Sequence, residues 1–271
     1  MLIDTHTHIV ADDHAKYPFD PGYPATWYHE IPVSSEKLWE LMGESGVDRA
    51  LLVQGYGPYK YDNSYAADAA QRSPDRFSSV GVVDLEQDPV AKLTYWVKER
   101  GLRGVRLIVS ADEANESWLD VWEQAIALGI PVLVQIQAPQ TPRLVQALQR
   151  FRESPIALDH CGFPDLSGGP PYANAKEFFA LAEVPSVHLK VTSIILQQAG
   201  EDGGDPRDLM KRLVGAFGAE RLMWGSDYSQ TNNRTYPEFA ELARYASSGL
   251  SAREQEWYHR ETALKFWPEL G

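Results

Sequence analysis

Two histidines near the start of the chain, His6 and His8, have the spacing of a pair that can act on one atom. They lie in the apolar, β-branched run 2–9, and residues two apart in a β-strand point to the same face. At a rise of about 3.3 Å per residue, the imidazoles leave the backbone about 7 Å apart and can converge on one metal ion or one carbonyl oxygen. The same alternation places Asp4 on their face and Ile3 opposite. A chance pair on a half-buried strand is the competing interpretation.

Other ionisable side chains occur near the ends of later predicted strands. His160 ends one such run and Asp227 ends another. Further polar residues alternate with Val, Ile and Leu inside the runs: Gln54, Arg106, Gln135, Gln137 and Lys190. An unpaired buried charge is costly, so several polar groups converging at one end of a sheet predict a reactive pocket. We expect His6, His8, His160 and Asp227 to be catalytic, and Gln54, Arg106 and Gln135 to bind substrate.

Several of these residues also have a plausible structural role. Gln54 could be a core amide with its hydrogen bonds satisfied, and Lys190 could form a salt bridge low in the fold. Asp159 could point outward and orient a helix end. Cys161 is expected to be a small buried side chain, because no base lies at the spacing of a nucleophile. Surface or lid positions are expected for His14, His29 and His259, and the roles of Gln137 and Lys190 stay open.

The elements that must position these residues are eight short apolar or β-branched runs. They are residues 2–9, 49–54, 77–84, 104–109, 131–137, 156–160, 188–193 and 221–227. Helical periodicity appears between them, as in Trp118, Trp122 and Ile126, and most strands recur about every 30 residues, the length of a βα unit. This alternation predicts an α/β fold, a (β/α)8 TIM barrel formed by residues 1–271 as one domain. The runner-up is an open doubly wound sheet, for which no Gly-rich phosphate motif is found.

Three other segments complete the predicted barrel. Residues 10–33, rich in proline and aromatics, form an extended loop after the first strand, on the face where barrel enzymes keep their active sites. A loop of this length is typical of a lid or pocket wall. A second insertion, 162–171, follows the sixth strand on the same face. A capping-box pattern starting at Ser251 predicts a closing helix.

Composition narrows the class of protein. The 271 residues include 44% hydrophobic residues and carry a net charge of −13, which argues against nucleic acid or an anionic membrane as partner. The single cysteine allows no intramolecular disulfide. A strand that begins at residue 2 leaves no room for a signal peptide, and no apolar run approaches the about 18 residues of a membrane span. We expect a cytoplasmic protein with a small-molecule substrate, and a homo-oligomer is compatible with the sequence.

Motifs at the ends of three predicted strands resemble the amidohydrolase superfamily. Asp4-Thr-His-Thr-His8 ends strand 1, and Leu158-Asp-His-Cys-Gly162 and Glu220-Arg-Leu-Met-Trp-Gly-Ser-Asp227 end strands 6 and 8. With Gly101-Leu-Arg-Gly-Val-Arg106 and Lys190-Val-Thr-Ser193, they are similar to the branch that contains 2-pyrone-4,6-dicarboxylate lactonase and the sugar lactonases. The similarity runs through the whole chain.

This resemblance also bears on metal binding. Zinc members of the superfamily normally have a histidine at the end of strand 5, where this chain has Gln135 and Gln137, and binuclear members have a Lys or Glu ligand on strand 4, where it has Arg106. An arginine stays protonated and cannot be a ligand, so a binuclear site is not expected. One divalent ion such as Zn²⁺ could be held by His6, His8, His160 and Asp227. The pyrone lactonase type is thought to work without metal, so no obligatory cofactor is expected.

The resemblance implies hydrolysis of a lactone. Asp227 would act as general base on water, the three histidines would polarise the carbonyl or hold a metal, and Arg106 would clamp a substrate carboxylate. Dicarboxylate lactonases carry an arginine where this chain has Phe163, and they read Asp-Trp-Pro where it has Asp227-Tyr-Ser. A lactone with one carboxylate, or a neutral sugar lactone, therefore fits better. The alternatives are a zinc-dependent amidohydrolase or decarboxylase of the same superfamily, and a non-catalytic barrel that binds a small ligand.

Overall fold

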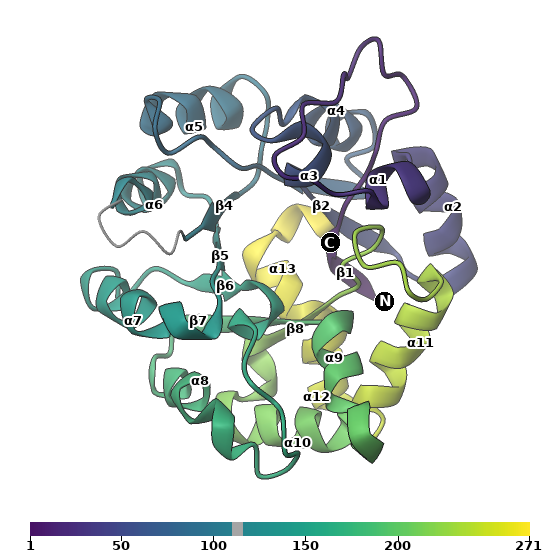
Figure 1. Ribbon diagram of the computed structural model, residues 1–271, viewed down its shortest axis with the longest axis vertical. Helices are drawn as coiled ribbons and strands as arrows, with labels where there is room; N and C mark the ends of the chain where they lie inside the picture. Colours follow the sequence, from purple (N-terminus) through teal and green to yellow (C-terminus); the bar gives the residue numbers. More distant parts are fainter. Residues whose placement is uncertain (110–115) are drawn as a thin grey trace.

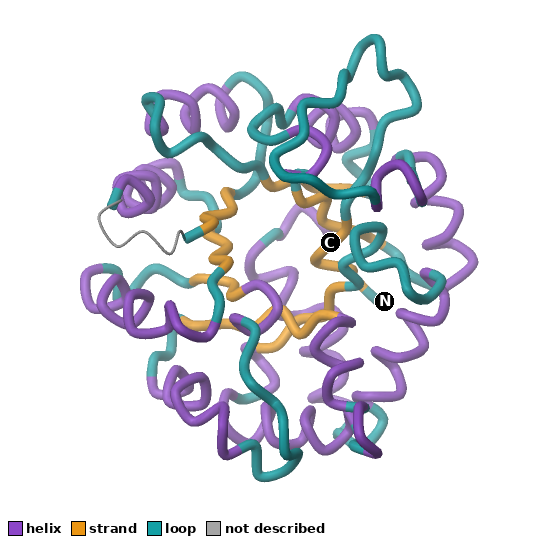
Figure 2. Tube along the Cα trace, in the orientation of Figure 1, coloured by secondary structure: helices purple, strands orange, loops and turns teal. Residues whose placement is uncertain are grey.

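The architecture is a ring of eight parallel strands surrounded by helices (Figures 1 and 2). The structure, a computed structural model, describes residues 1–109 and 116–271, and the count refers to these. The strands are β1 (Ile3–Thr7), β2 (Arg49–Val53), β3 (Phe77–Val80), β4 (Val105–Ile108), β5 (Val132–Gln135), β6 (Ile156–Leu158), β7 (Val187–Thr192) and β8 (Leu222–Gly225). Each lies inside or within one residue of a predicted run.

The strands form two sheets, β1 to β3 and β4 to β8, which meet at two seams. At one seam the Arg106 amide donates to the Gly81 carbonyl at 2.8 Å. At the other, the Asp227 amide donates to the His6 carbonyl at 2.8 Å. Parallel strands that follow in chain order, with helical crossovers between them, are the arrangement expected of a (β/α)8 barrel. The predicted fold class is confirmed.

The longer helices begin and end where local chemistry predicts. The helices are α1 (Trp27–Glu30), α2 (Ser35–Ser45), α3 (Tyr56–Tyr59), α4 (Ser64–Arg72), α5 (Pro89–Lys98), α6 (Ser117–Leu128), α7 (Thr141–Arg150), α8 (Lys176–Ala180), α9 (Ser193–Ala199), α10 (Pro206–Phe217), α11 (Tyr236–Ser247), α12 (Ala252–Glu256) and α13 (Thr262–Phe266). Gly46 and Gly129 end α2 and α6 at φ of 63° and 68°, a conformation that costs other residues a steric penalty. The helix predicted at Ser251 is α12, and its capping box is present. No helix among the described residues is both long and apolar enough to cross a lipid bilayer.

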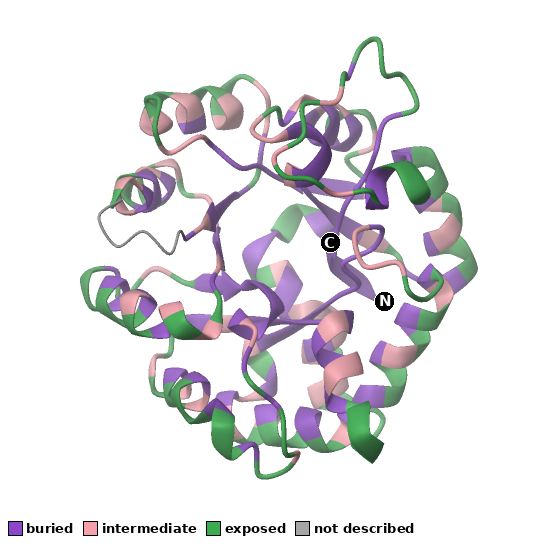
Figure 3. Cartoon of the chain, in the orientation of Figure 1, coloured by how far each residue is buried: buried purple, intermediate pink, exposed green. Residues whose placement is uncertain are grey.

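The inside of the ring is apolar at the amino ends of the strands. Ile3, Leu51, Val80, Leu133 and Met223 form a cluster there. It is covered by α13 and by the turn at Pro268–Leu270, whose Trp267 donates its indole N–H to the Arg103 carbonyl at 3.1 Å. We call this cluster, with the C-terminal segment that covers it, the floor of the barrel. The opposite end, where the carboxyl ends of the strands meet, is its mouth (Figure 3 shows most of the strand residues as buried).

Strand β1 contains an irregularity that changes which face its side chains take. Its pairing with β2 runs Asp4 to Ala50 and then Thr7 to Leu52, so β1 has one extra residue. One extra residue exchanges the two faces of a strand. Ile3 therefore lies in the floor although His6, of opposite parity, lies at the mouth. The prediction that Asp4 shares the face of His6 and His8 is wrong, because Asp4 accepts from the Tyr236 hydroxyl of α11 at 3.0 Å.

The loop 10–33 packs partly over the mouth. Tyr17, Trp27 and Tyr28 are buried, and the Trp27 ring centroid lies 5.9 Å from that of His8. From the tip of the loop, Tyr23 donates to the Gln230 side chain, in the segment after β8, at 3.2 Å. The loop therefore lies against the mouth, and its role as a lid or pocket wall stays a prediction. In α6, Trp118 and Trp122 are buried as expected, but Ile126 is 47% exposed, so its expected place on the core face is wrong.

Candidate active site

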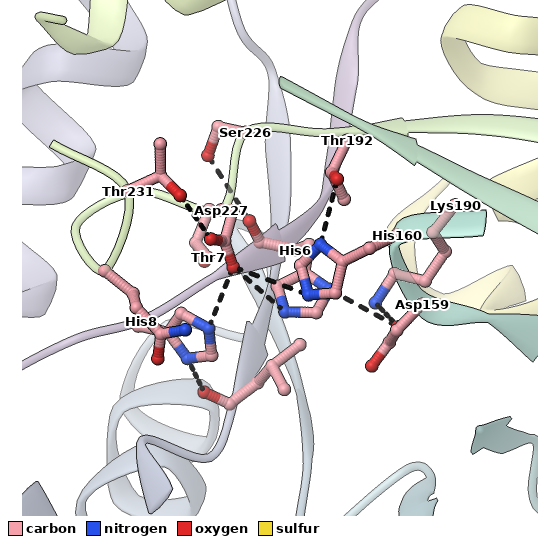
Figure 4. A network of polar contacts seen from close by, with 12 residues as sticks. His6, Thr7, His8, Asp159, His160, Lys190, Thr192, Ser226, Asp227 and Thr231 are labelled. Carbon is pink, nitrogen blue, oxygen red and sulfur yellow. Dashed lines mark hydrogen bonds and ion pairs between the residues drawn. The ribbon is translucent and has the colours of Figure 1, made fainter. Parts of the chain in front are cut away.

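Three imidazoles and one carboxylate meet at the mouth (Figure 4). Oδ1 of Asp227 lies 3.4 Å from Nε2 of His6, 3.3 Å from Nε2 of His8 and 3.9 Å from Nε2 of His160. All four side chains are at most 2% exposed. The structure thus brings together the four residues that were predicted to be catalytic, from the ends of β1, β6 and β8.

The backbone holds two of these residues in an uncommon conformation. Asp227 has φ of 63° and His160 has φ of 52°, both in the left-handed region that residues other than glycine rarely adopt. Such strain costs on the order of 1–3 kcal/mol, and it persists where the surroundings hold the residue in place. The Asp227 amide is fixed by the His6 carbonyl, and its Oδ2 accepts from the Thr231 hydroxyl at 2.5 Å. Only Oδ1 of Asp227 is left facing the imidazoles.

The Nδ1 atoms of the three rings point away from Asp227 and have contacts of their own. These contacts bear on whether each Nε2 atom, on the side of Asp227, carries a hydrogen or a lone pair. Nδ1 of His8 lies 3.0 Å from the Val53 carbonyl, which can only accept, so Nδ1 carries the hydrogen. The Nε2 atom of His8 is therefore a bare lone pair. Nδ1 of His6 lies 3.4 Å from a carboxylate oxygen of Asp159 and Nε2 lies 3.4 Å from one of Asp227, so these two contacts do not select its tautomer. Nδ1 of His160 lies 2.9 Å from the Thr192 hydroxyl, which can donate and so leave Nε2–H on the inner side.

A second charged group lies directly behind His6. Asp159 is fully buried, and Nζ of Lys190 lies 3.0 Å from its Oδ1. Nε of Arg106 donates to its Oδ2 at 2.7 Å. The predicted salt bridge of Lys190 is confirmed, but it lies at the mouth and not low in the barrel, and the outward orientation of Asp159 is wrong. Asp159 is the residue that sequence reasoning missed as part of the site, because its partners lie on three other strands.

Burial and these charges set the protonation states. Burial, with Lys190 adding to it, lowers the pKa of His6 well below its usual range, and burial lowers the pKa of His160 to about 4. Burial alone would raise the pKa of Asp227, but the His160, His8 and His6 imidazoles outweigh it and hold that pKa below its usual range. For Asp159, Lys190, His6 and Arg106 likewise outweigh burial, and the pKa of Asp159 is low. The neutral imidazoles of His6 and His160 thus lie beside an ionised carboxylate.

The donor set fits one divalent cation. Nε2 of His6, Nε2 of His8 and Oδ1 of Asp227 lie within 4.8 Å of one another, and none has a hydrogen-bond partner among the described residues. Lone pairs that face each other repel unless a positive charge lies between them. A tetrahedral ion with bonds of about 2.0–2.1 Å spaces its ligands about 3.3–3.4 Å apart, which matches both Asp227 distances. Asp159 behind His6 is the outer carboxylate that metal-binding histidines commonly have. His160 is outside this group of three.

The three glutamines do not join the cluster. Strand alternation places Ala50 and Leu52 on the face of Gln54, but both pack in the outer core whereas Leu51 lies in the floor, so Gln54 does not have the parity of the inward residues. The Gln54 amide donates to the Lys60 and Asp62 carbonyls at 3.3 and 2.7 Å, which satisfies it as a core amide. Gln135 is half-buried at the end of β5, with the parity of Leu133, and its substrate role stays a prediction. Gln137 is exposed.

The remaining candidate residues lie in positions that suit a structural role. Cys161 is buried, and burial raises the pKa of its thiol, so it is no nucleophile. His14 and His29 are exposed, and His259 is half-buried beside Ser247. Arg106 is 5% exposed; Nε is used by Asp159, and no other hydrogen bond of its guanidinium occurs among the described residues. A role for Arg106 toward substrate therefore depends on its Nη atoms.

Comparison with known proteins agrees with this arrangement. The family model described as amidohydrolase matches residues 3–268. A curated relative, the L-fucono-1,5-lactonase of Burkholderia ambifaria, is 31% identical over 206 residues, which are 71% of this chain and 69% of the relative.

Solved structures share the fold over nearly the whole chain. A Pseudomonas putida protein assigned as a 2-pyrone-4,6-dicarboxylic acid hydrolase has a TM-score of 0.80 at 24% identity, covering 99% of this chain and 97% of its own. An amidohydrolase of Burkholderia multivorans with bound zinc has a TM-score of 0.78 at 22% identity, covering 99% of both chains. The family model and the curated relative together confirm the resemblance seen in the motifs: this chain belongs to the amidohydrolase family.

Proposed function

We propose that the protein is a hydrolase that opens the ring of a small lactone. The observation that carries this proposal is the convergence of His6, His8 and His160 on one free oxygen of Asp227 at the mouth of the barrel. Such a group can activate water and stabilise negative charge on a carbonyl oxygen, the two requirements of ester hydrolysis. The relationship to a curated lactonase supports the ester class.

In this proposal the residues divide the work. Asp227 is ionised at neutral pH, and its Oδ1 accepts the proton of the attacking water. As the water oxygen bonds to the carbonyl carbon, His160 donates its Nε2–H to the oxygen that becomes negative, because Thr192 holds the other ring nitrogen. The ring C–O bond then breaks, and the leaving alkoxide takes up the proton that Asp227 accepted from water. The product is a hydroxy acid. The Nε2 atom of His8 presents a lone pair and cannot donate, because its Nδ1 hydrogen is directed to the Val53 carbonyl.

The residues that would hold a divalent ion are His6, His8 and Asp227. When bound, such an ion supplies Lewis acidity, which makes water a better acid and polarises a carbonyl. A bound ion would favour the tautomer of His6 that has its Nε2 lone pair on the inner side and its Nδ1–H toward Asp159. Oδ1 of Asp227 is both the candidate ligand atom and the base of the metal-free reaction, so the two roles are alternatives that metal removal can separate.

The test is a screen of the purified protein against aromatic-derived and sugar lactones, followed by Asp227→Asn. This change keeps the shape of the side chain and removes the base, and we expect kcat to fall by about 10³-fold or more. Asp75→Asn is the control for the same chemical change, since Asp75 is 76% exposed and is not part of the cluster. Undiminished turnover by Asp227→Asn would show that the assignment is wrong, and failure to open any lactone would favour a non-catalytic binding barrel.

A second measurement addresses the metal. Protein purified without added metal is analysed for bound metals, treated with a chelator, and assayed before and after Zn²⁺ or Mn²⁺ is restored. Loss of activity on chelation and its recovery would support the ion site. Full activity in protein with no bound divalent ion would show that the imidazoles act directly on the substrate.

A further inference from the structure

A small cavity opens beside the catalytic cluster, at the carboxyl ends of β3 and β4. Its volume is about 240 Å³, slightly below the about 300–1,000 Å³ of sites for drug-sized ligands, so it suits one small ring. Its wall includes Tyr56, Tyr61, Asp84, Glu86 and Arg106, and none of the four clustered residues lines it. Arg106 connects the two, because its Nε donates to Asp159, which lies behind His6.

The wall combines aromatic rings with oxygen atoms. The Tyr56 and Tyr61 rings are perpendicular with centroids 5.4 Å apart, and their hydroxyl oxygens are 3.5 Å apart. Val82 and Leu107 add an apolar surface. A sugar ring presents apolar C–H faces together with hydroxyl edges, and tyrosines meet both needs, with an apolar ring and a polar tip.

The carboxylates of the cavity favour neutral hydroxyls over a second carboxylate. Asp84 is 14% exposed, and its Oδ1 accepts from the Glu86 amide at 3.0 Å. Its Oδ2 is 3.9 Å from Nζ of Lys92, too far for a hydrogen bond, and so remains an acceptor. Glu86 adds a second negative charge, and the positive charge of Arg106 is shared with Asp159. An anionic ligand would meet repulsion from Asp84 and Glu86, whereas a hydroxyl would meet acceptors.

We propose that this cavity is the subsite that binds the hydroxyl groups of a neutral, polyhydroxylated lactone, with Asp84 and Tyr61 as its specificity-determining residues. The inference rests on the proposed lactone hydrolysis and names the substrate class of that site. The lactone carbonyl then lies at the Asp227 cluster and the hydroxyl-bearing carbons extend toward β3 and β4. The role of Arg106 as a clamp for a substrate carboxylate is secondary in this arrangement.

The first experiment compares three lactones of similar ring size: a neutral aldonolactone, unsubstituted δ-valerolactone, and a lactone that carries a carboxylate. The native protein should have its highest kcat/KM on the aldonolactone. In Asp84→Asn and Tyr61→Phe, the ratio of kcat/KM for the aldonolactone over that for δ-valerolactone should fall about tenfold, mainly through KM, the scale of one hydrogen bond to a charged group. Asp75→Asn, outside the cavity, should leave this ratio unchanged.

Two results would overturn the subsite: a native preference for the carboxylated lactone, or an equal loss on the aldonolactone and δ-valerolactone in Asp84→Asn. A second experiment keeps the subsite testable if no lactone is hydrolysed. Binding of a neutral monosaccharide such as L-fucose, which has the hydroxyls but no ester, is measured by calorimetry on the native protein and on Asp84→Asn. Binding that is weakened about tenfold in the variant supports the subsite independently of hydrolysis, and absence of binding to the native protein contradicts it.

Discussion

The two ends of the barrel interior are equally buried and have opposite chemistry. At the floor, Leu133 and Met223 are 0% exposed and touch other apolar side chains. At the mouth, Asp159, Lys190 and Asp227 are also 0% exposed, yet each is ionisable. Burial of apolar surface stabilises a fold by about 25 cal/mol per Å², whereas burial of a charge costs several kcal/mol unless partners compensate.

This difference separates stability from reactivity within one barrel. The floor gains its free energy from packing and leaves no group free to react. The mouth keeps polar atoms of His6, His8 and Asp227 without hydrogen bonds among the described residues, which no packing argument favours. Buried polar groups without partners are expected where a ligand or an ion completes them, so substitutions at the two ends should have separable effects.

The largest effect on stability is expected for Asp159→Asn, at the mouth. The change leaves the positive charges of Lys190 and Arg106 buried without the negative charge that compensates them. Breaking a buried ion pair in this way costs about 3–5 kcal/mol. The free energy of unfolding, measured with urea, should fall by that amount, and kcat should fall too, because His6 loses the negative charge that faces its Nδ1.

A second variant distinguishes a lost charge balance from a lost shape. Asp159→Asn combined with Lys190→Met removes the stranded ammonium, so part of the lost stability should return while kcat stays low. If the double variant is less stable than the single one, the ion pair is not what holds this region together.

At the floor, Leu133→Ala should lower stability without impairing turnover. The change leaves a cavity among apolar neighbours, and such substitutions cost about 2–5 kcal/mol. Steady-state kinetics well below the lowered melting temperature should give a kcat within about twofold of the native value. A large fall in kcat under these conditions would show that the floor and the mouth are coupled, contrary to the comparison above.

The sequence predicted much of this arrangement because the relevant signals are local. Strands end where apolar runs end, and in a barrel the carboxyl ends of all strands meet at one face. His6, His8, His160 and Asp227 could therefore be assigned to one cluster from their positions in the runs alone. The capping box at Ser251 follows from an equally local pattern.

What the sequence did not predict depends on contacts between distant segments. The extra residue of β1 reverses side-chain parity, and simple alternation gave Asp4 the wrong face. Asp159 was expected to point outward because the neighbours that compensate its charge, Lys190 and Arg106, lie on other strands. The sequence did contain a relevant pattern. Ionisable residues occur in β4, directly after β6 and in β7, and buried charges of opposite sign are expected to pair with one another.

The smallest effect we expect is on the hydroxyl that holds His160. Thr192→Val keeps the volume of the side chain and removes the group at 2.9 Å from Nδ1 of His160. Without it the imidazole is no longer biased to carry Nε2–H, so kcat should fall about tenfold, which corresponds to about 1.4 kcal/mol. The free energy of unfolding should fall by only about 1 kcal/mol, the usual cost of one hydrogen bond.

Thr262→Val is the matched control for this variant. Thr262 is equally buried, but it lies in α13, beside the floor, and its hydroxyl donates to the Ala219 carbonyl at 3.5 Å. Both variants exchange a buried hydroxyl for a methyl group, so both should lose a similar, small amount of stability. Only Thr192→Val should lower kcat, because only its hydroxyl contacts an imidazole of the cluster. An equal fall in kcat in the two variants would mean that rigidity of the whole barrel, and not the orientation of His160, sets the rate.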